Sequence, residues 1–421
     1  MNVGRRRTLG CLGGWPAAAW ITGPGMAQAA PPDRPPGQPV AVRPPQPWAV
    51  WDSFVQQFIG DGGRVVETAD ARQRTVSEAQ AYAMFFALVA NQPELFGRLL
   101  RWTEDNLAGG DLAQRLPAWL WGRRDDGSWG VVDDNAAADA DLWIAHTLGE
   151  AGRLWGVPRY TALSQQLAAR IQREEVAELP GLGPMLLPAP RGFEPVQGRW
   201  RLNPSYLPPL QLRWFASRFG GPWQALHDNA LRLLRESAPG GLAPDWAVWD
   251  GTRQRFEPAD GGGSYDAIRV YLWLGLSAAW PGVRPTLTHF APMAALVDAR
   301  GVPPETWGVP ASVGTAATAA TPSGTAPGGF SAALLPFLQA LGQPAAVRRQ
   351  LALLQARPAA PDAYYDRVLR LFGEGAHTGR YRFDAAGGLV PAWRPPAARV
   401  SSSQAPFSQA PASRAPAPPR A

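Results

Sequence analysis

The sequence contains no lysine, because all 40 basic residues are arginine. This absence excludes a Walker-type phosphate loop, a Schiff-base enzyme and a Ser–Lys dyad, since each needs a lysine amine. The single cysteine, Cys11, lies near the start of the chain, so the remainder can form neither a disulfide nor a thiol nucleophile. Four histidines are present, at His146, His227, His289 and His377. Their spacing matches no metal-binding motif, and we expect neither a metal nor a cofactor.

Long apolar runs and basic runs are also missing. Beyond residue 30 no stretch approaches the roughly 20 apolar residues that a membrane-spanning helix needs. The formal net charge is +6, and three of these charges belong to Arg5, Arg6 and Arg7. Without them the charge is 6 − 3 = +3, and no basic cluster remains in the body of the chain. We therefore expect no membrane span and no nucleic-acid partner.

The two ends of the chain differ in composition from its body. Residues 1–29 resemble an export signal, with arginines at 5–7, a modestly apolar middle and Ala27-Gln28-Ala29 as a cleavage site. General secretion and twin-arginine export both remain open. Residues 30–47 form a Pro-rich linker, and residues 395–421 form a Pro/Ala/Ser tail that we expect to be disordered. Residues 48–394 remain and are long enough for one large domain. We expect a monomer that is located in the periplasm or secreted.

Residues 135–155 contain the clearest helical pattern. Ile144, Leu148, Ala151 and Trp155 recur at i, i+4, i+7 and i+11, which places them on one face of an α-helix. Similar helix starts lie near residues 77, 139, 204, 264 and 329, spaced by 60–65 residues. A second set of helices alternates with them, at about 93–107, 158–174, 222–237, 286–299 and 343–356. This alternation predicts stacked helical hairpins.

Further elements complete the expected domain. A first helix is predicted at 48–59 and a last one at 361–372, which makes about twelve in all. We expect a short closing hairpin at 381–393, a loop at 116–135, an irregular segment at 180–201, a mouth loop at 242–246 within 239–257, and a flexible loop at 301–329. Few segments alternate in the manner of strands, so the chain is predicted to be all-α.

Three acids mark the helix starts. Asp139 follows one start directly, Glu78 opens the preceding segment of the same kind, and Asp266 opens a later one. Acids in the first turn are common because they stabilise the helix amino terminus, so simple capping is one interpretation. Glu78 and Asp139 are 61 residues apart, and Asp139 and Asp266 are 127 residues apart. These separations are close to one and two times the spacing between successive helix starts. In a closed ring of hairpins, all inner helices start at one end, and the three acids would converge there as a site.

Tryptophan is abundant, with 19 residues against 8 tyrosines and 15 phenylalanines. Trp119, Trp121 and Trp129 cluster in the loop that precedes residue 135. An aromatic plane on a loop suits the C–H face of a sugar ring, although core packing is the more common role of any one tryptophan.

Several blocks of sequence resemble those of glycoside hydrolase family 8. They are TVSEAQAYAM, LAGGDLAQRLPAWLWG, NAAADADLWIAHTLGEAGRLW, NPSY, APDW, SYDAIR and YYDRVLRLFG. The resemblance runs from about residue 51 to 393 and is closest to the endoglucanases that accompany bacterial cellulose synthases. It implies an (α/α)6 toroid and inverting hydrolysis of a β-1,4-glucan.

The resemblance also implies roles for individual residues. Glu78 would be the general acid and Asp266 the general base, while Asp139 would bind and distort the sugar beside the cut. The remaining substrate-binding residues would be Tyr206, Tyr265, Arg269 and Trp129. For Arg269, which lies one turn after Asp266, a purely structural ion pair is equally compatible with the sequence.

The implied partner is β-1,4-glucan, with the cellulose synthase export complex as a further partner. Chitosan, xylan or mixed-linkage glucan would suit the same fold. A non-catalytic glucan-binding protein is the alternative of a different class. Such a protein would need the tryptophan loops but not Glu78, Asp139 and Asp266, so the intact acids favour an enzyme.

Overall fold

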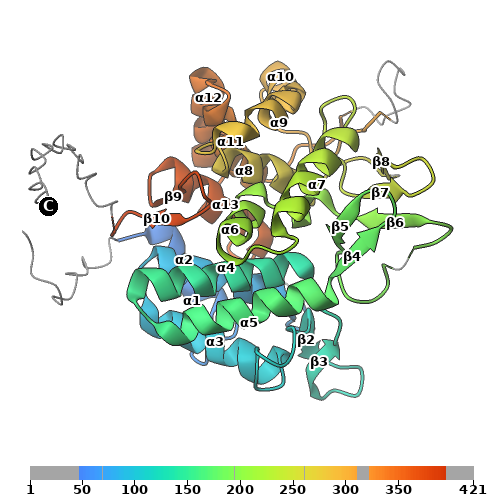
Figure 1. Ribbon diagram of the computed structural model, residues 1–421. Coiled ribbons are helices and arrows are strands. Elements are labelled where there is room, and N and C mark those ends of the chain that lie inside the picture. Colours follow the sequence, from blue (N-terminus) through green and yellow to red (C-terminus); the bar gives the residue numbers. More distant parts are fainter. Residues whose placement is uncertain (1–46, 69, 194, 260, 311–321, 395–421) are drawn as a thin grey trace, which may run out of the picture. The chain divides into compact units, whose positions relative to one another are not determined.

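A ring of inner helices forms the centre of the domain. The computed structural model describes residues 47–68, 70–193, 195–259, 261–310 and 322–394 (Figure 1). The inner helices are α2 (Ser77–Val89), α4 (Ala138–Trp155), α6 (Pro209–Phe219), α8 (Ile268–Leu276), α11 (Gly328–Ala340) and α13 (Tyr364–His377). Each contacts the next in this order. The ring closes through Phe372 of α13, whose ring centroid lies 4.7 Å from that of Phe86 in α2.

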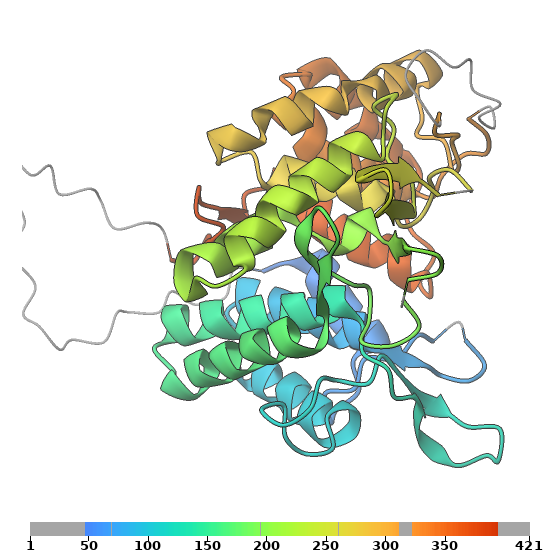
Figure 2. The same cartoon turned by 45° about the vertical axis from the view of Figure 1, so that its right-hand side comes forward.

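Outer helices return the chain between the inner ones. They are α1 (Ala49–Phe58), α3 (Pro93–Leu107), α5 (Pro158–Glu174), α7 (Trp223–Glu236), α9 (Arg284–His289), α10 (Ala291–Arg300) and α12 (Pro344–Ala356). The pairs α2/α3, α4/α5, α6/α7 and α11/α12 are in contact, and α1 packs on α13. Helices α4 and α5 run side by side in both ribbon views (Figures 1 and 2). The predicted (α/α)6 toroid is therefore confirmed.

The difference between the two sets of helices follows from their sequences. All nine residues of α8 are buried, and its sequence IRVYLWLGL has only one charged residue. In α7, by contrast, buried residues such as Leu226, Ala230 and Leu233 alternate with polar ones. A helix that is apolar on all sides is stable only inside a protein, whereas a one-sided apolar stripe suits the outer layer.

Short antiparallel strands lie in the connections between the helices. They are β1 (Thr75–Val76), β2 (Leu120–Arg123), β3 (Trp129–Asp133), β4 (Val176–Leu179), β5 (Gly183–Leu186), β6 (Arg199–Leu202), β7 (Ala247–Asp250), β8 (Arg255–Pro258), β9 (Tyr381–Phe383) and β10 (Leu389–Pro391). Strands β1–β2–β3 and β6–β7–β8 form two three-stranded sheets, and β4–β5 and β9–β10 form hairpins. The segments predicted as a loop at 116–135 and as irregular at 180–201 thus contain strands, and that part of the prediction is wrong.

Several predicted helices have different bounds in the structure: the last one, predicted at 361–372, is α13 (Tyr364–His377), and two others differ in kind. The segment that starts at 204 is a short 3-10 helix, η1 (Pro204–Tyr206), and α6 begins only at Pro209. The outer helix predicted at 286–299 is divided into α9 and α10 at Phe290, after a 3-10 turn η2 (Pro281–Val283). In both cases proline lies in the first turn of the new helix, where its missing N–H is tolerated.

The C-terminal hairpin closes the domain against α4, as the prediction of a closing hairpin at 381–393 requires. Glu150, buried in α4, accepts hydrogen bonds from the Leu389 amide (2.7 Å) and from the indole of Trp214 (2.6 Å). It also forms ion pairs with Arg153 and Arg218. One carboxylate therefore links α4, α6 and the hairpin β9–β10, and its charge is fully compensated.

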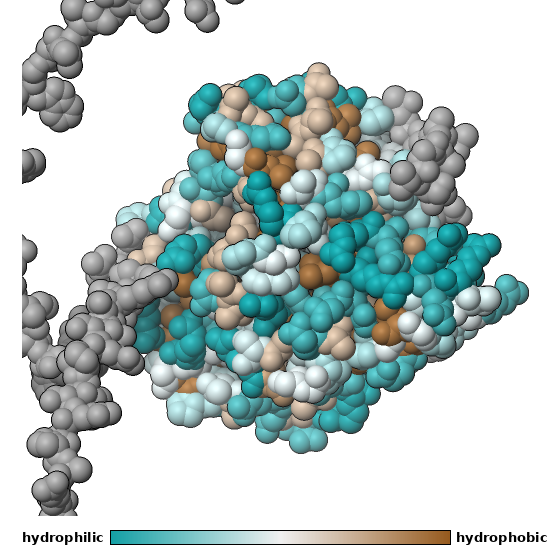
Figure 3. Space-filling model, turned by 45° about the horizontal axis from the view of Figure 1, so that its top comes forward, coloured by the Kyte–Doolittle hydropathy of each residue, from teal (hydrophilic) through white to brown (hydrophobic). Residues whose placement is uncertain are grey.

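Several predictions concern residues outside the described ranges. These are the export signal (1–29), nearly all of the linker (30–46), the tail (395–421) and the centre of the 301–329 loop. Within the described part of the chain no helix is long and apolar enough to cross a membrane. The face of the molecule shown in Figure 3 is mostly hydrophilic, with apolar residues in small scattered patches.

Candidate active site

The three predicted acids lie at or just before the starts of inner helices. Glu78 is the second residue of α2 and Asp139 is the second residue of α4. Asp266 lies two residues before α8, not in its first turn as predicted.

Asp245 explains the position of Asp266. Its carboxylate accepts hydrogen bonds from the backbone amides of Ser264 (2.8 Å) and Ala267 (2.7 Å), and from the Ser264 hydroxyl (2.5 Å). These bonds fix residues 264–267 as a turn ahead of the helix. The block APDW, which contains Asp245, thereby sets the direction of the Asp266 side chain, a role that its sequence alone did not indicate.

Arg269 lies at the centre of the site. Its guanidinium is buried and donates to Asp266 Oδ1 (2.7 Å) and to Asp139 Oδ2 (3.3 Å). It also donates to the hydroxyls of Ser205 (2.9 Å) and Tyr82 (3.4 Å). A planar guanidinium can bond several oxygens at once, and here it brings acids from α4 and from the turn before α8 together. The structure thus places Arg269 between two of the predicted site residues.

No cation of the described residues is in direct contact with Glu78. Within that part of the chain, its carboxylate accepts one side-chain hydrogen bond, a long one from the Ser77 hydroxyl (3.4 Å). The side chain is partly accessible to solvent, yet burial raises the pKa of Glu78. Its own backbone amide and the charge of Arg269 oppose this rise, whereas the charge of Asp266 adds to it. The protonated form of this carboxyl is therefore stabilised relative to its ionised form.

Asp139 is more deeply buried, with 2% of its surface exposed. Burial, followed by the charge of Glu78, raises the pKa of Asp139 well above its ordinary value, and Arg269 opposes this rise. Its Oδ1 also accepts a hydrogen bond from the Ala140 amide (2.9 Å) at the amino terminus of α4. The three acids thus act on one another electrostatically, as convergence on one end of the ring requires.

Asp266 lies among hydrogen-bond donors. Asn203 donates to Asp266 Oδ2 (3.1 Å), while Arg269 holds the other oxygen. Each oxygen of the Asp266 carboxyl therefore has a donor, which fixes the orientation of the side chain. Asn203 is itself fixed by Ser205, whose amide (3.0 Å) and hydroxyl (2.8 Å) donate to its side-chain oxygen. The roles of Asn203 and Ser205 were missed, although both belong to the NPSY block.

Comparison with known proteins identifies the family of this chain. The sequence profile described as "Glycosyl hydrolases family 8" matches residues 40–379. This chain belongs to that family. The endoglucanase of Xanthomonas axonopodis pv. citri (strain 306) is 49% identical over 361 residues, which cover 84% of this chain and 92% of that protein. The endoglucanase of Escherichia coli (strain K12) is 45% identical, over 82% of this chain and 91% of that protein.

A solved structure is similar over nearly all of its length. The endo-1,4-D-glucanase from Vibrio fischeri ES114 is 39% identical, with a TM-score of 0.73, and the match covers 82% of this chain and 99% of that one. The predicted membership of family 8 is therefore confirmed.

Two predicted tyrosines of this family 8 chain lie in different surroundings. Tyr206 is half-buried, and the charge of Asp139, followed by burial, raises its pKa. The Arg269 guanidinium lies 5.6 Å from its ring centroid. Tyr265 is 43% exposed, and its hydroxyl donates to Glu305 (2.8 Å). Tyr206 thus belongs to the charged centre of the site, whereas Tyr265 lies at its edge.

Trp129 lies apart from the acids, on strand β3. Its ring stacks on Trp121 with centroids 5.6 Å apart, and the Arg64 guanidinium lies 5.1 Å from it. The ring is 47% exposed. No contact recorded within the described ranges joins it to Glu78, Asp139 or Asp266, so the structure does not bring this predicted residue into the charged centre.

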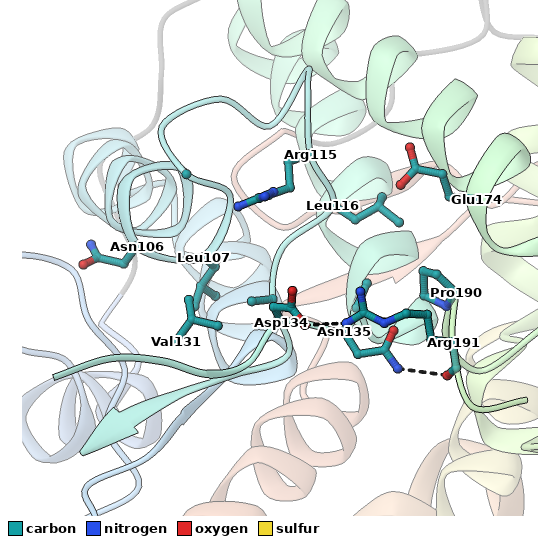
Figure 4. Close-up of a pocket in the computed structure, with 13 residues that line it drawn as sticks. Asn106, Leu107, Arg115, Leu116, Val131, Asp134, Asn135, Glu174, Pro190 and Arg191 are labelled. Carbon is teal, nitrogen blue, oxygen red and sulfur yellow. Dashed lines mark hydrogen bonds and ion pairs between the residues drawn. The ribbon is translucent and has the colours of Figure 1, made fainter. Parts of the chain in front are cut away.

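A separate pocket of about 320 Å³ lies between the end of α3, strand β3 and residues 190–191 (Figure 4). Its wall includes Arg115, Glu174 and Asn135, and Asn135 donates to the Arg191 carbonyl (2.9 Å). None of the three predicted acids lines it. Among the described residues, no group of three His, Cys, Asp or Glu side chains is placed to hold a metal ion.

Proposed function

We propose that this family 8 protein is an endo-β-1,4-glucanase that cleaves its substrate with inversion. The observation that carries the proposal is the contrast between two carboxyls. Among the described residues no cation contacts Glu78, whose pKa is raised, whereas Asp266 accepts hydrogen bonds from Arg269 and Asn203. Glu78 is therefore suited to act as the acid, and Asp266, oriented by two donors, to act as the base.

The mechanism follows from these two states. Protonated Glu78 donates its proton to the oxygen that leaves when the glycosidic bond breaks. Asp266 removes a proton from a water molecule that attacks the anomeric carbon from the opposite face. Glu78 is then ionised and Asp266 protonated, so the proton must return to Glu78 before the next cycle. Inverting enzymes need roughly 6.5–9.5 Å between the two carboxyls so that the water fits.

Asp139 is proposed to hold the sugar next to the cut in a distorted form. It comes from α4, between the helices that carry the acid and the base. Arg269 and Tyr206 complete the charged centre, and we propose that both position the substrate. Tyr265 and Trp129, which are more exposed, would bind sugars further along the chain through their rings.

Substitution of the acid and the base tests this assignment. Glu78→Gln and Asp266→Asn should each reduce kcat by about 10²–10⁴-fold while cellooligosaccharide binding is largely kept, because each removes only a proton transfer. Asp139→Asn should weaken both binding and turnover. Glu94→Gln on α3 and Asp52→Asn on α1 are matched controls at the exposed starts of outer helices. Near-normal turnover in Glu78→Gln or Asp266→Asn removes that residue from its role.

The substrate is tested by release of reducing ends. We expect soluble carboxymethyl cellulose to be cleaved faster than chitosan, xylan or mixed-linkage glucan. Faster cleavage of one of these would keep the mechanism and change the substrate. Binding of glucan without any cleavage would instead indicate a non-catalytic glucan-binding protein.

We further propose that the protein is exported and acts in cellulose synthesis, as a monomer. The arginine-rich start and the Ala-Gln-Ala sequence at 27–29 support export. Cell fractionation, with an Ala29 substitution that blocks cleavage, tests the periplasmic or secreted location. Co-purification with the cellulose synthase export complex tests that partner, and recovery in the cytoplasm would contradict both proposals.

A further inference from the structure

Two buried carboxyl groups lie behind Asp139 and are not used in the proposed mechanism. Asp141 is in the first turn of α4, and Glu175 directly follows the last residue of α5. Their exposed fractions are 0% and 1%. In the described part of the chain, no N–H or O–H donor outside the pair reaches any of their four carboxyl oxygens. The two carboxyls lie within hydrogen-bonding reach of each other.

The charges around this pair are acidic. Asp139, Glu78 and Glu174 act on Asp141, and Asp139 and Glu174 act on Glu175. Burial, above all, raises the pKa of both carboxyls well above their ordinary values. The cations nearby are engaged elsewhere, since Arg269 pairs with Asp139 and Arg170 pairs with Glu174. Ionisation of both carboxyls is strongly disfavoured, because the described residues place no cation beside this adjacent buried pair.

The backbone around the pair forms a closed connection to the start of α4. The Glu175 carbonyl accepts a hydrogen bond from the Leu187 amide (2.8 Å). The next residue, Pro188, accepts one from the Ala138 amide (3.0 Å), the first residue of α4. The contact between Asp141 and Glu175 joins the same two segments a second time. The side-chain pair and the backbone bonds therefore fix the turn that carries Asp139.

We propose that Asp141 and Glu175 share a proton and act as a positioning pair, which holds the first turn of α4 so that Asp139 reaches Arg269 and the sugar. The protonated carboxyl donates to its ionised neighbour, and this bond replaces the missing N–H donors. The effect on catalysis rests on the proposed function, whereas the effect on stability does not depend on it.

Stability as a function of pH provides the first test. The native pair holds a proton that the unfolded chain releases at lower pH, so its contribution to stability is lost as pH rises. In Asp141→Asn the side-chain amide N–H donates to Glu175, so this hydrogen bond no longer needs a proton shared between two carboxyls. The melting temperature of this variant relative to wild type should therefore increase by about 2–4 °C between pH 6 and pH 9. Glu175→Gln should behave in the same way.

A matched control comes from the next residue. Glu174 is exposed, lines the pocket in Figure 4 and pairs with Arg170. Glu174→Gln removes a neighbouring charge but leaves both carboxyls of the pair in place, so its melting temperature relative to wild type should change much less with pH than that of Asp141→Asn. A constant difference for Asp141→Asn as well would overturn the shared proton.

Activity provides the second test. Asp141→Ala removes the bond, and a displaced Asp139 should lower kcat/KM on cellohexaose by about 10–100-fold. Asp141→Asn keeps the bond and should restore most of this loss. If both variants fold and lose activity equally, the positioning role is wrong. If wild type cleaves no polysaccharide while the pH effect on stability appears, the proposed function fails and the shared proton stands.

Discussion

Arg269 is a buried cation with several partners, and its shape explains why. Its two terminal nitrogens donate to Asp266 and Asp139, and to the hydroxyls of Ser205 and Tyr82. Lysine has a single ammonium group, which cannot bond the two acids in this planar arrangement.

We therefore predict that Arg269→Lys lowers kcat/KM by about 10²-fold or more, since Asp266 and Asp139 would lose their common donor. Steady-state kinetics on cellohexaose measures the effect. Arg348→Lys, on the exposed side of α12, is the matched control and should keep wild-type kinetics. Equal activity in both variants would show that Arg269 is only a structural ion pair.

His146 makes the free energy of unfolding depend on pH. It is fully buried in α4, where its Nε2 bonds the Gly387 carbonyl (3.0 Å), and burial lowers its pKa from 6.5 to about 4. The unfolded chain therefore binds a proton between pH 6.5 and 4 that the native state does not, so stability falls as pH decreases through this range.

This shift corresponds to about 3 kcal/mol of stability lost between pH 7 and pH 4. We predict that His146→Gln, although less stable at pH 7, loses correspondingly less over that interval. Urea denaturation at a series of pH values measures the difference. Parallel curves for wild type and variant would exclude His146 as the source.

The site was predictable from the sequence where a residue type and a helix start coincide. Glu78 and Asp139 follow recognisable starts, and the repeat spacing brought Asp266 into the same set. The contribution of Asp245 was not predictable, because its bonds to Ser264 and Ala267 join parts of the α7–α8 connection that lie 19 and 22 residues apart. For the same reason the pairing of Asp141 with Glu175 appears only when α4 and α5 are packed together.

At the scale of elements, close packing of inner helices requires glycine at particular positions. Gly373 in α13 faces the carbonyl of Ala332 in α11, and an added Cβ would overlap that oxygen. The two helices could then not approach as they do.

We predict that Gly373→Ala lowers the free energy of unfolding by about 1–3 kcal/mol, because the backbone must move. Gly97 in α3 offers a control, since a Cβ there meets only the flexible end of Arg101 at 3.6 Å. Gly97→Ala should be neutral or stabilising by up to about 1 kcal/mol. Chemical denaturation of both variants tests the prediction, and equal effects would contradict it.

Local turn signals explain which elements were predicted and which were missed. Helices at 93–107 and 158–174 were predicted with the bounds that the structure shows, because a proline at the first position and a clear apolar stripe mark them. The β2–β3 hairpin was missed although Asp126-Gly127 is a strong hairpin signal and Gly127 has φ of 84°. Pro292 likewise marks the start of α10 within a segment that was predicted as one helix.

At the scale of the whole molecule, the ring order makes a stereochemical prediction. Counting inner helices as α2, α4, α6 and α8, the helix of Glu78 and that of Asp266 are three positions apart in a ring of six. In the proposed mechanism the two acids therefore approach the cleaved bond from opposite sides, with water attacking in a single step.

We predict that the new reducing end appears first as the α-anomer and then mutarotates. Proton NMR of the anomeric region during the first minutes of cellohexaose hydrolysis measures this. An initial β-anomer would mean that the second acid acts as a nucleophile, and would contradict both assigned roles.

The last hairpin of the chain has a consequence for how the protein folds. Leu389 bonds Glu150 across 239 residues, and Trp393 bonds the Leu88 carbonyl across 305. Such distant contacts carry a large loop-closure entropy and slow folding. A chain made from its amino terminus holds α2 and α4 long before their final partners exist. The unclosed ring exposes apolar helix faces to solvent during that interval, and exposed apolar faces promote aggregation. Synthesis of the C-terminal hairpin is therefore the step that allows these faces to be buried.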